Sequence, residues 1–245
     1  AYIGDRAAEE KRGSMTAFAS IARSAVIILS FLAATAAAQA QADRQTRTPA
    51  AGATQPVDRP GDFDFYVLSL SWQPGWCAEK GATTGACRIG AGVGFILHGL
   101  WPQRERGWPR DCATEERDPS FAQTRAMADI MGSSGLAWHE WKKHGRCSGL
   151  GAKAYFELSR DAWQRISLPE VFHKINKTLR ISPEVIETAF LTANPDLKAD
   201  GVSITCKRGR ISEVRICLDR NLEFRLCSDE MQRECRMSAT LEAHR

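Results

Sequence analysis

Two short segments of the chain bring together the residue types that acid–base catalysis needs. Residues 95–102 read FILHGLWP and residues 138–147 read WHEWKKHGRC, so together they hold three of the five histidines of the chain. Because imidazole titrates near neutral pH, one histidine can begin neutral and accept a proton while another begins protonated and donates one. A lysine in the second segment can stabilise negative charge in a transition state. The candidate catalytic residues are His98, His139, Glu140, Lys143 and His144.

Residues 138–144 have the spacing of a short helix. At about 100° per residue, the four polar candidates of this segment fall on one arc of about 140°, with Trp138 and Trp141 on the opposite side. We therefore expect the two tryptophans to anchor the helix in the core while the polar groups face a cleft. We expect Gly145 to close the helix in a left-handed conformation.

Two other interpretations of this helix are open. It could be an amphipathic helix whose charged face is simply solvated, although two histidines so close together are a costly choice for solubility. It could also be a zinc helix, but zinc proteases place their two histidines four residues apart, whereas His139 and His144 are five apart. That step turns the second ligand by about 140°, and Lys143 would repel a cation. We expect no metal ion and no cofactor.

His98 lies at the end of an expected strand, directly before Gly99, which lets backbone or substrate come close. Taken alone, His98 could be a structural histidine. The second segment, with its two further histidines, favours a catalytic role for it. RNA offers chemistry that fits both segments, because its 2′-hydroxyl is an internal nucleophile beside the phosphorus. A base must remove that proton, and an acid must protonate the departing 5′-oxygen. DNA lacks the hydroxyl, so we expect RNA, and not DNA, as the substrate.

The charge of the chain is small for a nucleic-acid-binding protein. The formal net charge is +4 over 245 residues. This excludes a protein that coats nucleic acid through a large basic surface. A substrate with phosphates must instead be held locally, in a cleft.

The N-terminal part reads as a signal peptide followed by a linker. Residues 25–37 form an apolar run behind Arg23, and residues 38–40 (AQA) fit the small-residue rule for cleavage, with Met15 as the expected start. The run is short for a transmembrane helix, although a retained membrane anchor is the alternative. The expected parts are a leader over residues 1–40, a flexible linker over residues 41–61 and one catalytic domain over residues 62–245.

All eight cysteines follow residue 76. An even number of cysteines behind a signal peptide indicates disulfides formed in an oxidising compartment, and eight cysteines allow 105 pairings. A structural zinc site is the alternative, but no Cys-x-x-Cys pair occurs. We expect a secreted or periplasmic protein.

Strand patterns flank a helical middle, which predicts an α+β fold with an antiparallel β-sheet packed against helices in one disulfide-stabilised domain. We expect the first strand to end at residues 73–77 and the second at Pro102. The expected strands are residues 63–72, 93–100, 202–207, 211–219 and 222–227, and the expected helices are residues 120–131, 138–144, 152–166, 170–179 and 183–192.

The two segments resemble the two active-site motifs of the ribonuclease T2 family of secreted acid ribonucleases. HGLWP at residues 98–102 and HEWKKHGRC at residues 139–147 stand in the family's order. A weaker likeness extends through the first strand and the C-terminal strands, so the resemblance covers most of residues 62–228. It implies an α+β fold and cleavage of RNA through 2′,3′-cyclic phosphates, which are then hydrolysed to 3′-phosphates.

The resemblance also implies a role for each candidate. His144 would be the general base and His98 the general acid, Glu140 and Lys143 would stabilise the transition state, and His139 would hold phosphate. Trp101 and Gln103 would contact the substrate, with Trp101 helping to stack the base on the 5′ side of the cut. The implied disulfides are Cys77–Cys87, Cys112–Cys147, Cys206–Cys235 and Cys217–Cys227, of which the second would clamp the two catalytic segments together.

The chain departs from the family pattern at three base-binding positions. Leu136 stands where members carry an aromatic residue, Ser71 where some carry Gln, and Gln103 where some carry Asp. The base preference is therefore open. The protonation of His144 is open as well, because a helix C-terminus favours the charged imidazole while the neighbouring Lys143 opposes it.

These observations predict a metal-independent endoribonuclease with a lyase-type first step, monomeric and free of the membrane in its mature form. One alternative is a secreted RNA-binding or signalling protein of the same fold that has lost catalysis. A purely structural disulfide-rich protein is a second alternative. An RNA-cleavage assay separates the enzyme from both.

Overall fold

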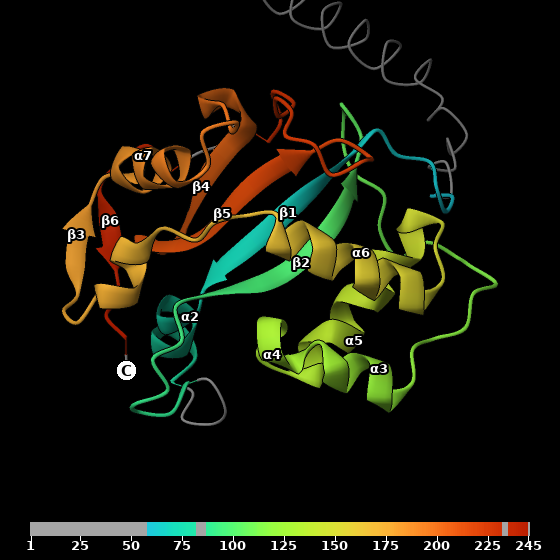
Figure 1. Cartoon of the computed structure of the whole chain (residues 1–245), viewed down its shortest axis with the longest axis horizontal. Helices are drawn as coiled ribbons and strands as arrows, with labels where there is room; N and C mark the ends of the chain where they lie inside the picture. Colours follow the sequence, from blue (N-terminus) through green and yellow to red (C-terminus); the bar gives the residue numbers. More distant parts are fainter. Residues whose placement is uncertain (1–57, 82–86, 232–234, 245) are drawn as a thin grey trace, which may run out of the picture. The chain divides into compact units, whose positions relative to one another are not determined.

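A mixed β-sheet runs through the part of the chain that the computed structural model describes, namely residues 58–81, 87–231 and 235–244 (Figure 1). The strand order is β2-β1-β5-β6-β3, and β4 pairs with β5. All pairings are antiparallel except the short parallel contact between β5 and β6. The strands are β1 (Phe65–Trp72), β2 (Phe95–Gln103), β3 (Leu179–Ile181), β4 (Val202–Lys207), β5 (Arg210–Leu218) and β6 (Ala239–Leu241).

Helices pack beside both ends of this sheet. In Figure 1, α3 to α6 gather beside β2, whereas α7 lies near β3 and β4. The sheet with its helices confirms the α+β prediction, although the sheet is mixed and not wholly antiparallel. The α-helices are α2 (Gln73–Lys80), α3 (Phe121–Ala126), α4 (Ala128–Met131), α5 (Ser134–Lys143), α6 (Ala152–Gln164) and α7 (Pro183–Ala193). The 3-10 helices are η2 (Gly145–Ser148), η3 (Glu170–Lys174) and η4 (Ala199–Gly201).

Strand β1 is buried on both faces. Leu68, Leu70 and Trp72 point into the main core, as the period of two in a strand requires. Phe65 and Val67 point to the other face and join a smaller apolar cluster. The positions that continue this second face are serines, whose small side chains leave space above the sheet for larger polar groups from neighbouring strands.

Several element boundaries differ from the sequence prediction. Strand β2 continues through Pro102 because it is an edge strand, where a missing N–H can face away from the neighbouring strand. Residues 73–77 open helix α2 and do not merely end a strand, and helix α5 begins at Ser134, with the Ser133 hydroxyl as its N-cap. The predicted helix at 170–179 is a 3-10 turn followed by β3.

The predicted third C-terminal strand, residues 222–227, is also absent as a strand. It forms one isolated bridge, between Phe224 and Leu218, within the described residues. The Cys217–Cys227 disulfide and the hydrogen bond from the Cys227 N–H to the Asp200 carbonyl, 2.7 Å, hold this segment in place. The short strand β6 is the final strand instead.

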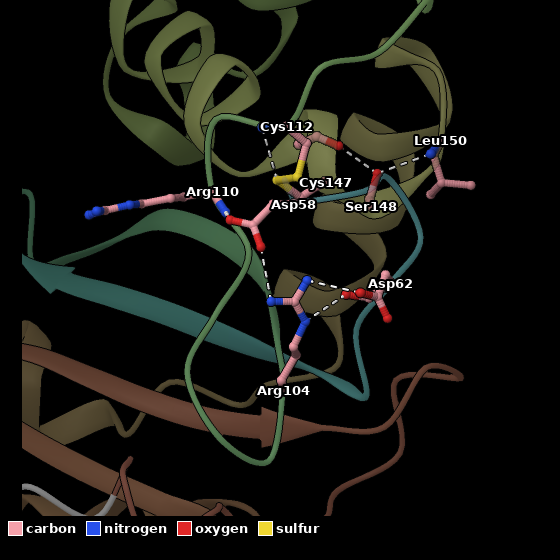
Figure 2. The surroundings of a disulfide bond; sticks show 9 residues. Asp58, Asp62, Arg104, Arg110, Cys112, Cys147, Ser148 and Leu150 are labelled. Atoms are coloured by element: carbon pink, nitrogen blue, oxygen red, sulfur yellow. Dashed lines mark hydrogen bonds and ion pairs between the residues drawn. A yellow bond between two sulfur atoms is a disulfide. The ribbon is translucent and has the colours of Figure 1, made fainter. Parts of the chain in front are cut away.

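Four disulfides connect the described residues, and the one between Cys112 and Cys147 joins the loop after β2 to the end of η2 (Figure 2). Nearby, Arg104 forms ion pairs with Asp58 and Asp62, and the Gly61 N–H donates to the Cys147 carbonyl at 2.9 Å. Residues 58–61, which we expected in the linker, thus contact the domain. The pairs are those that the family resemblance implied: Cys77–Cys87, Cys112–Cys147, Cys206–Cys235 and Cys217–Cys227.

The predicted signal peptide and most of the predicted linker lie outside the described residues. Within the described ranges, no helix has both the length and the apolar character needed to span a membrane.

Gly145 has a different role from the one that its sequence position predicted. It lies in the 3-10 turn η2 and not in the left-handed conformation, which Gly149 adopts with φ at 77°. A β-carbon at Gly145 would lie 2.6 Å from the Trp141 ring and 2.8 Å from the Tyr155 ring. Both rings are fully buried, so a side chain at this position would have to displace the core.

We therefore expect Gly145→Ala to lower the free energy of unfolding by about 1–3 kcal/mol through overpacking. Gly135→Ala is the matched control, because its β-carbon would meet only the Ser133 hydroxyl at 3.9 Å. Alanine is the better helix former, so this control should raise stability by up to about 1 kcal/mol. Urea denaturation measures both variants, and equal stability of Gly145→Ala and wild type would contradict the packing argument.

Candidate active site

His98 lies at a β-bulge in strand β2. Ser69 of β1 pairs with Gly99 and the next residue, Leu70, pairs with Leu97, so His98 is the extra residue without a partner. A bulge of this kind re-aims a side chain beside a functional site. The register between two strands, which no local pattern reveals, therefore sets the direction of the His98 ring.

The His98 ring lies between two carboxylates from different elements. Its Nδ1 is 2.6 Å from Oε1 of Glu213 on β5, and its Nε2 is 3.5 Å from Oε1 of Glu140 on α5. Burial works to lower the pKa of His98, but the hydrogen bond to Glu213 and the charge of Glu140 outweigh it and raise the pKa above its usual value. His98 therefore favours the protonated form.

Glu140 is buried where α5 approaches β2. Trp101 donates from Nε1 to Oε2 of Glu140 at 2.6 Å. A β-carbon at Gly99 would overlap that carboxylate oxygen and lie 2.5 Å from Trp101 Nε1, so this approach requires glycine. Burial raises the pKa of Glu140, opposed by the charge of His98 and the hydrogen bond from Trp101.

His144 lies at the C-cap of α5 and is also buried. Its ring stacks on the indole of Trp101, with centroids 5.0 Å apart and planes at 25°. Burial, followed by the positive charge of Lys143, lowers the pKa of His144 to about 3. The effect of the helix C-terminus is therefore outweighed, and His144 is neutral. Its Nδ1 makes no hydrogen bond within the described residues.

Sequence reasoning missed two site residues on β5, Glu213 and Arg215. Arg215 pairs with Glu213 at 2.7 Å and lies 5.1 Å from the centroid of the Trp101 ring. Burial would raise the pKa of Glu213, but the hydrogen bond with His98 and the charge of Arg215 lower it to about 2. The available signal was that Glu213 and Arg215 alternate with apolar residues in the strand predicted over residues 211–219.

Small residues flank Arg215 on both neighbouring strands. It pairs with Ser69 of β1 and with Ser203 of β4, and both serine hydroxyls are buried without a partner in the described part of the chain. Cross-strand partners point to the same face of a sheet. The two serines therefore leave the space that lets the guanidinium lie over the sheet and reach Glu213 and Trp101.

The remaining candidates on α5 lie further out. His139 is exposed and Lys143 is half-buried, and no hydrogen bond or ion pair joins either side chain to the other candidates within the described ranges. Both side chains influence the pKa of Glu140 and of His144 through charge, which puts them at the edge of the site. Trp141 anchors the helix as expected, but Trp138 is 41% exposed and lies under Lys142, so the expected second anchor is wrong.

The two predicted substrate contacts are less open than the sequence indicated. Trp101 is only 8% exposed because its ring meets both His144 and Arg215, and little of it is free for a base to stack on. Gln103 is buried at the end of β2, where its carbonyl accepts from the Asp64 N–H at 2.7 Å. The structure does not bring the Gln103 side chain to the wall of the cleft.

A cleft of about 850 Å³ opens beside His98. Glu213 and Arg215 form part of its floor, and Ser71 and Leu136, two of the departures from the family pattern, line it nearby. Trp101 and His144 lie outside its lining. No group of three or more metal-ligating side chains is arranged to hold a metal ion in the parts of the chain that the structure covers.

Comparisons with known proteins find similar proteins by sequence and by fold. The model of the Ribonuclease T2 family matches residues 63–227. A protein named ribonuclease from Aeromonas hydrophila is 35% identical over 197 residues, covering 74% of this chain and 84% of that protein. The solved structure of RNase NT with 5′-AMP is 25% identical with a TM-score of 0.54, covering 74% of this chain and 98% of that one. An RNase-related protein from Calystegia sepium shares the fold, with 20% identity, a TM-score of 0.58, and coverage of 75% and 98%.

Proposed function

The chain belongs to the ribonuclease T2 family and is an endoribonuclease; we propose that it cleaves single-stranded RNA without a metal ion. In the proposed first step the 2′-oxygen attacks the adjacent phosphorus, the bond from phosphorus to the 5′-oxygen breaks, and a 2′,3′-cyclic phosphate forms. In the second step water opens the ring to leave a 3′-phosphate. The observation that carries this proposal is the opposite electrostatic setting of the two histidines: His98 is partly exposed beside two carboxylates, whereas His144 is buried beside Lys143.

His144 is suited to act as the base. Its lowered pKa, about 3, keeps the imidazole neutral near neutral pH, the state in which a base must begin. Stacking on Trp101 fixes the plane of the ring. Burial and, after it, the charge of Lys143 keep His144 neutral, and Lys143 can also stabilise charge on the non-bridging oxygens.

His98 is suited to act as the acid. Its hydrogen bond to Glu213 through Nδ1 leaves Nε2 as the proton donor for the departing 5′-oxygen. We also assign Glu140 a role in stabilising the transition state. It contacts both His98 and Trp101 and so fixes the distance between them. We assign His139, which is exposed next to Glu140 on α5, the role of holding a phosphate.

Product analysis in the presence of EDTA tests the proposed function. We expect cyclic phosphates to accumulate first and 3′-phosphates to follow, with EDTA leaving the rate unchanged. DNA of the same sequence should survive, because it has no 2′-hydroxyl. Full loss of activity in EDTA, or products without a cyclic intermediate, would refute the mechanism.

Glu213 should act as a positioning residue for His98, visible in the pH profile. The acid must be protonated, so activity falls as the pH rises through the pKa of His98, which Glu213 raises. Glu213→Gln removes the charge that raises this pKa and leaves Arg215 unopposed. We therefore expect the alkaline limb of kcat/KM to move about 1–2 units to lower pH.

The pH profile of Glu213→Gln on a dinucleotide provides the measurement. Glu157→Gln, an exposed carboxylate on α6, is the control and should leave both limbs in place. Glu213→Asp keeps a carboxylate and should restore activity over part of the alkaline pH range that Glu213→Gln loses. An alkaline limb that stays where it is in Glu213→Gln would show that Glu213 has only a structural role.

We also propose that the protein acts in a secreted or periplasmic location as a monomer, with a leader over residues 1–40 and a linker that gives way to the catalytic domain before residue 58, because residues 58–61 already contact that domain. Four disulfides among the described residues support an oxidising compartment.

A further inference from the structure

The cleft beside His98 is longer than cleavage of one bond requires. Strand β5 runs along it from Arg215, next to the catalytic groups, to Arg210, which also lines it. At about 3.4 Å per residue these two positions lie roughly 17 Å apart. That span exceeds the length of one nucleotide, so the far end can receive a part of the substrate that the cut itself does not involve.

An aromatic side chain stands at this far end on a rigid support. Trp76 lines the cleft and is 47% exposed, and within the described residues no other aromatic ring packs on it. It belongs to α2, which begins with Pro74 in its first turn and is tied by the Cys77–Cys87 disulfide. A β-carbon at Gly75 would lie 3.1 Å from the Ile211 carbonyl, so α2 packs closely on β5 at this point.

Positive charge surrounds Trp76. Lys80, Lys207 and Arg210 line this end of the cleft, against Glu79 as the one carboxylate lining it there among the described residues. Glu79 pairs with Lys207 at 3.2 Å and with Arg208 at 3.4 Å, and Arg210 pairs with Glu242 at 2.9 Å. Four cations, counting Lys80, thus stand against two carboxylates, which leaves a surplus of positive charge. A fixed aromatic face beside cations is the combination that binds single-stranded nucleic acid, since the ring stacks on a base and the cations contact the backbone.

The direction of the substrate follows from the two histidines. On the proposed function, His98 protonates the oxygen that leaves with the nucleoside 3′ to the cut. His98 lines the cleft, whereas His144, the proposed base, does not. The cleft therefore begins at the leaving group and extends from there. It receives the part of the RNA strand that lies 3′ to the cut.

We propose that Trp76, Lys80, Lys207 and Arg210 form a downstream subsite that binds a nucleotide beyond the first one 3′ to the cut. The base stacks on Trp76 and the cations contact its phosphate. This inference rests on the proposed function and adds to it a preference for longer RNA over dinucleotides.

A ladder of substrates tests the subsite. Each carries a single ribonucleotide at the cut, with one, two or three deoxynucleotides on its 3′ side, so that cleavage occurs at one bond only. We expect kcat/KM to rise about tenfold when the strand reaches the subsite, the gain that stacking on an aromatic ring provides. The gain should appear mainly in KM.

Trp76→Ala should abolish the gain from longer strands while the substrate with one downstream nucleotide is cleaved as by wild type. Trp76→Phe, which keeps an aromatic face, should retain most of the gain. Trp108→Ala is the matched control, because Trp108 is 51% exposed and lies outside the lining of the cleft.

Two outcomes would overturn the subsite and leave the proposed function standing: a flat ladder for wild type, or an equal loss on all substrates in Trp76→Ala. Failure of wild type to cleave any substrate at its ribonucleotide would instead refute the proposed function, and the subsite with it. The two failures are therefore distinguishable in one experiment.

Discussion

Replacing His144 or His98 by alanine is expected to lower kcat for a dinucleotide by about 10²–10⁴-fold, the contribution that a positioned acid or base makes. Each variant removes one of the two proton transfers and leaves the other group in place. Both side chains are contained in a preformed site, so we expect the variants to keep the circular dichroism spectrum and melting behaviour of a folded protein. His173→Ala, an exposed histidine in η3, is the control and should be fully active.

The leaving group distinguishes the two roles. When a 4-nitrophenyl group replaces the downstream nucleoside, the departing phenolate needs no proton, so the acid becomes unnecessary. His98→Ala should recover most of its lost rate on this substrate, whereas His144→Ala should stay inactive, since the 2′-hydroxyl still needs a base. Recovery of His144→Ala in place of His98→Ala would mean that the assigned roles are reversed.

The protonation states behind these roles depend on residues that the sequence could not bring together. The segments 95–102 and 138–147 were identifiable because their residue types and spacing are local. Glu213, which holds His98, lies 115 residues further along the chain, and only the pairing of β1 with both β2 and β5 places them side by side. The bulge that aims His98 depends on the same register.

Helix α5 shows which features of a helix its sequence periodicity can predict and which it cannot. The helical spacing placed Trp141 in the core, in agreement with the structure. It also predicted that the polar side chains face a cleft, but Glu140 and His144 are buried, and none of the four polar candidates of α5 lines the cleft beside His98. It also placed Trp138 in the core, where it does not lie, because periodicity gives the angle of a residue but not the extent of the surface that covers the helix. The start of α5 at Ser134 was missed since Ser133 and Gly135 resemble a turn.

At Gly145 and Pro102, tertiary packing overrides the conformation that each residue type commonly adopts. Glycine after a helix commonly adopts the left-handed conformation and proline commonly ends a strand. Here close packing on two aromatic rings explains the glycine, and the edge position of β2 accommodates the proline. Local preference therefore predicted the wrong conformation at Gly145 and the wrong strand end at Pro102, because tertiary packing decides both.

The largest loss of stability is expected from removing the Cys112–Cys147 disulfide with the double change Cys112→Ser and Cys147→Ser. The bond closes a loop of 35 residues. Loop-closure entropy for that length gives roughly 4 kcal/mol of stabilisation. Urea denaturation at low temperature, where the variant still folds, measures this loss.

The same disulfide should also affect catalysis, because it holds the end of α5. The Cys147 N–H donates to the His144 carbonyl at 2.9 Å, and the Asp111 N–H, next to Cys112, donates to the Lys143 carbonyl at 2.9 Å. The contacts around the bond, drawn in Figure 2, join this loop to residues 58–62 as well. Loosening the loop that carries Cys112 should therefore displace His144 and Lys143. We expect kcat to fall by about tenfold or more.

The Cys206–Cys235 disulfide supplies the matched control. It closes a loop of 29 residues, so removing it should cost nearly the same stability, about 4 kcal/mol. It joins β4 to the segment before β6 and makes no bond to α5, so kcat on a dinucleotide should stay close to wild type at a temperature where both double variants are folded. Equal losses of kcat in the two would show that the Cys112–Cys147 bond acts through global stability alone, whereas a loss confined to Cys112→Ser with Cys147→Ser would show that it positions His144 and Lys143 directly.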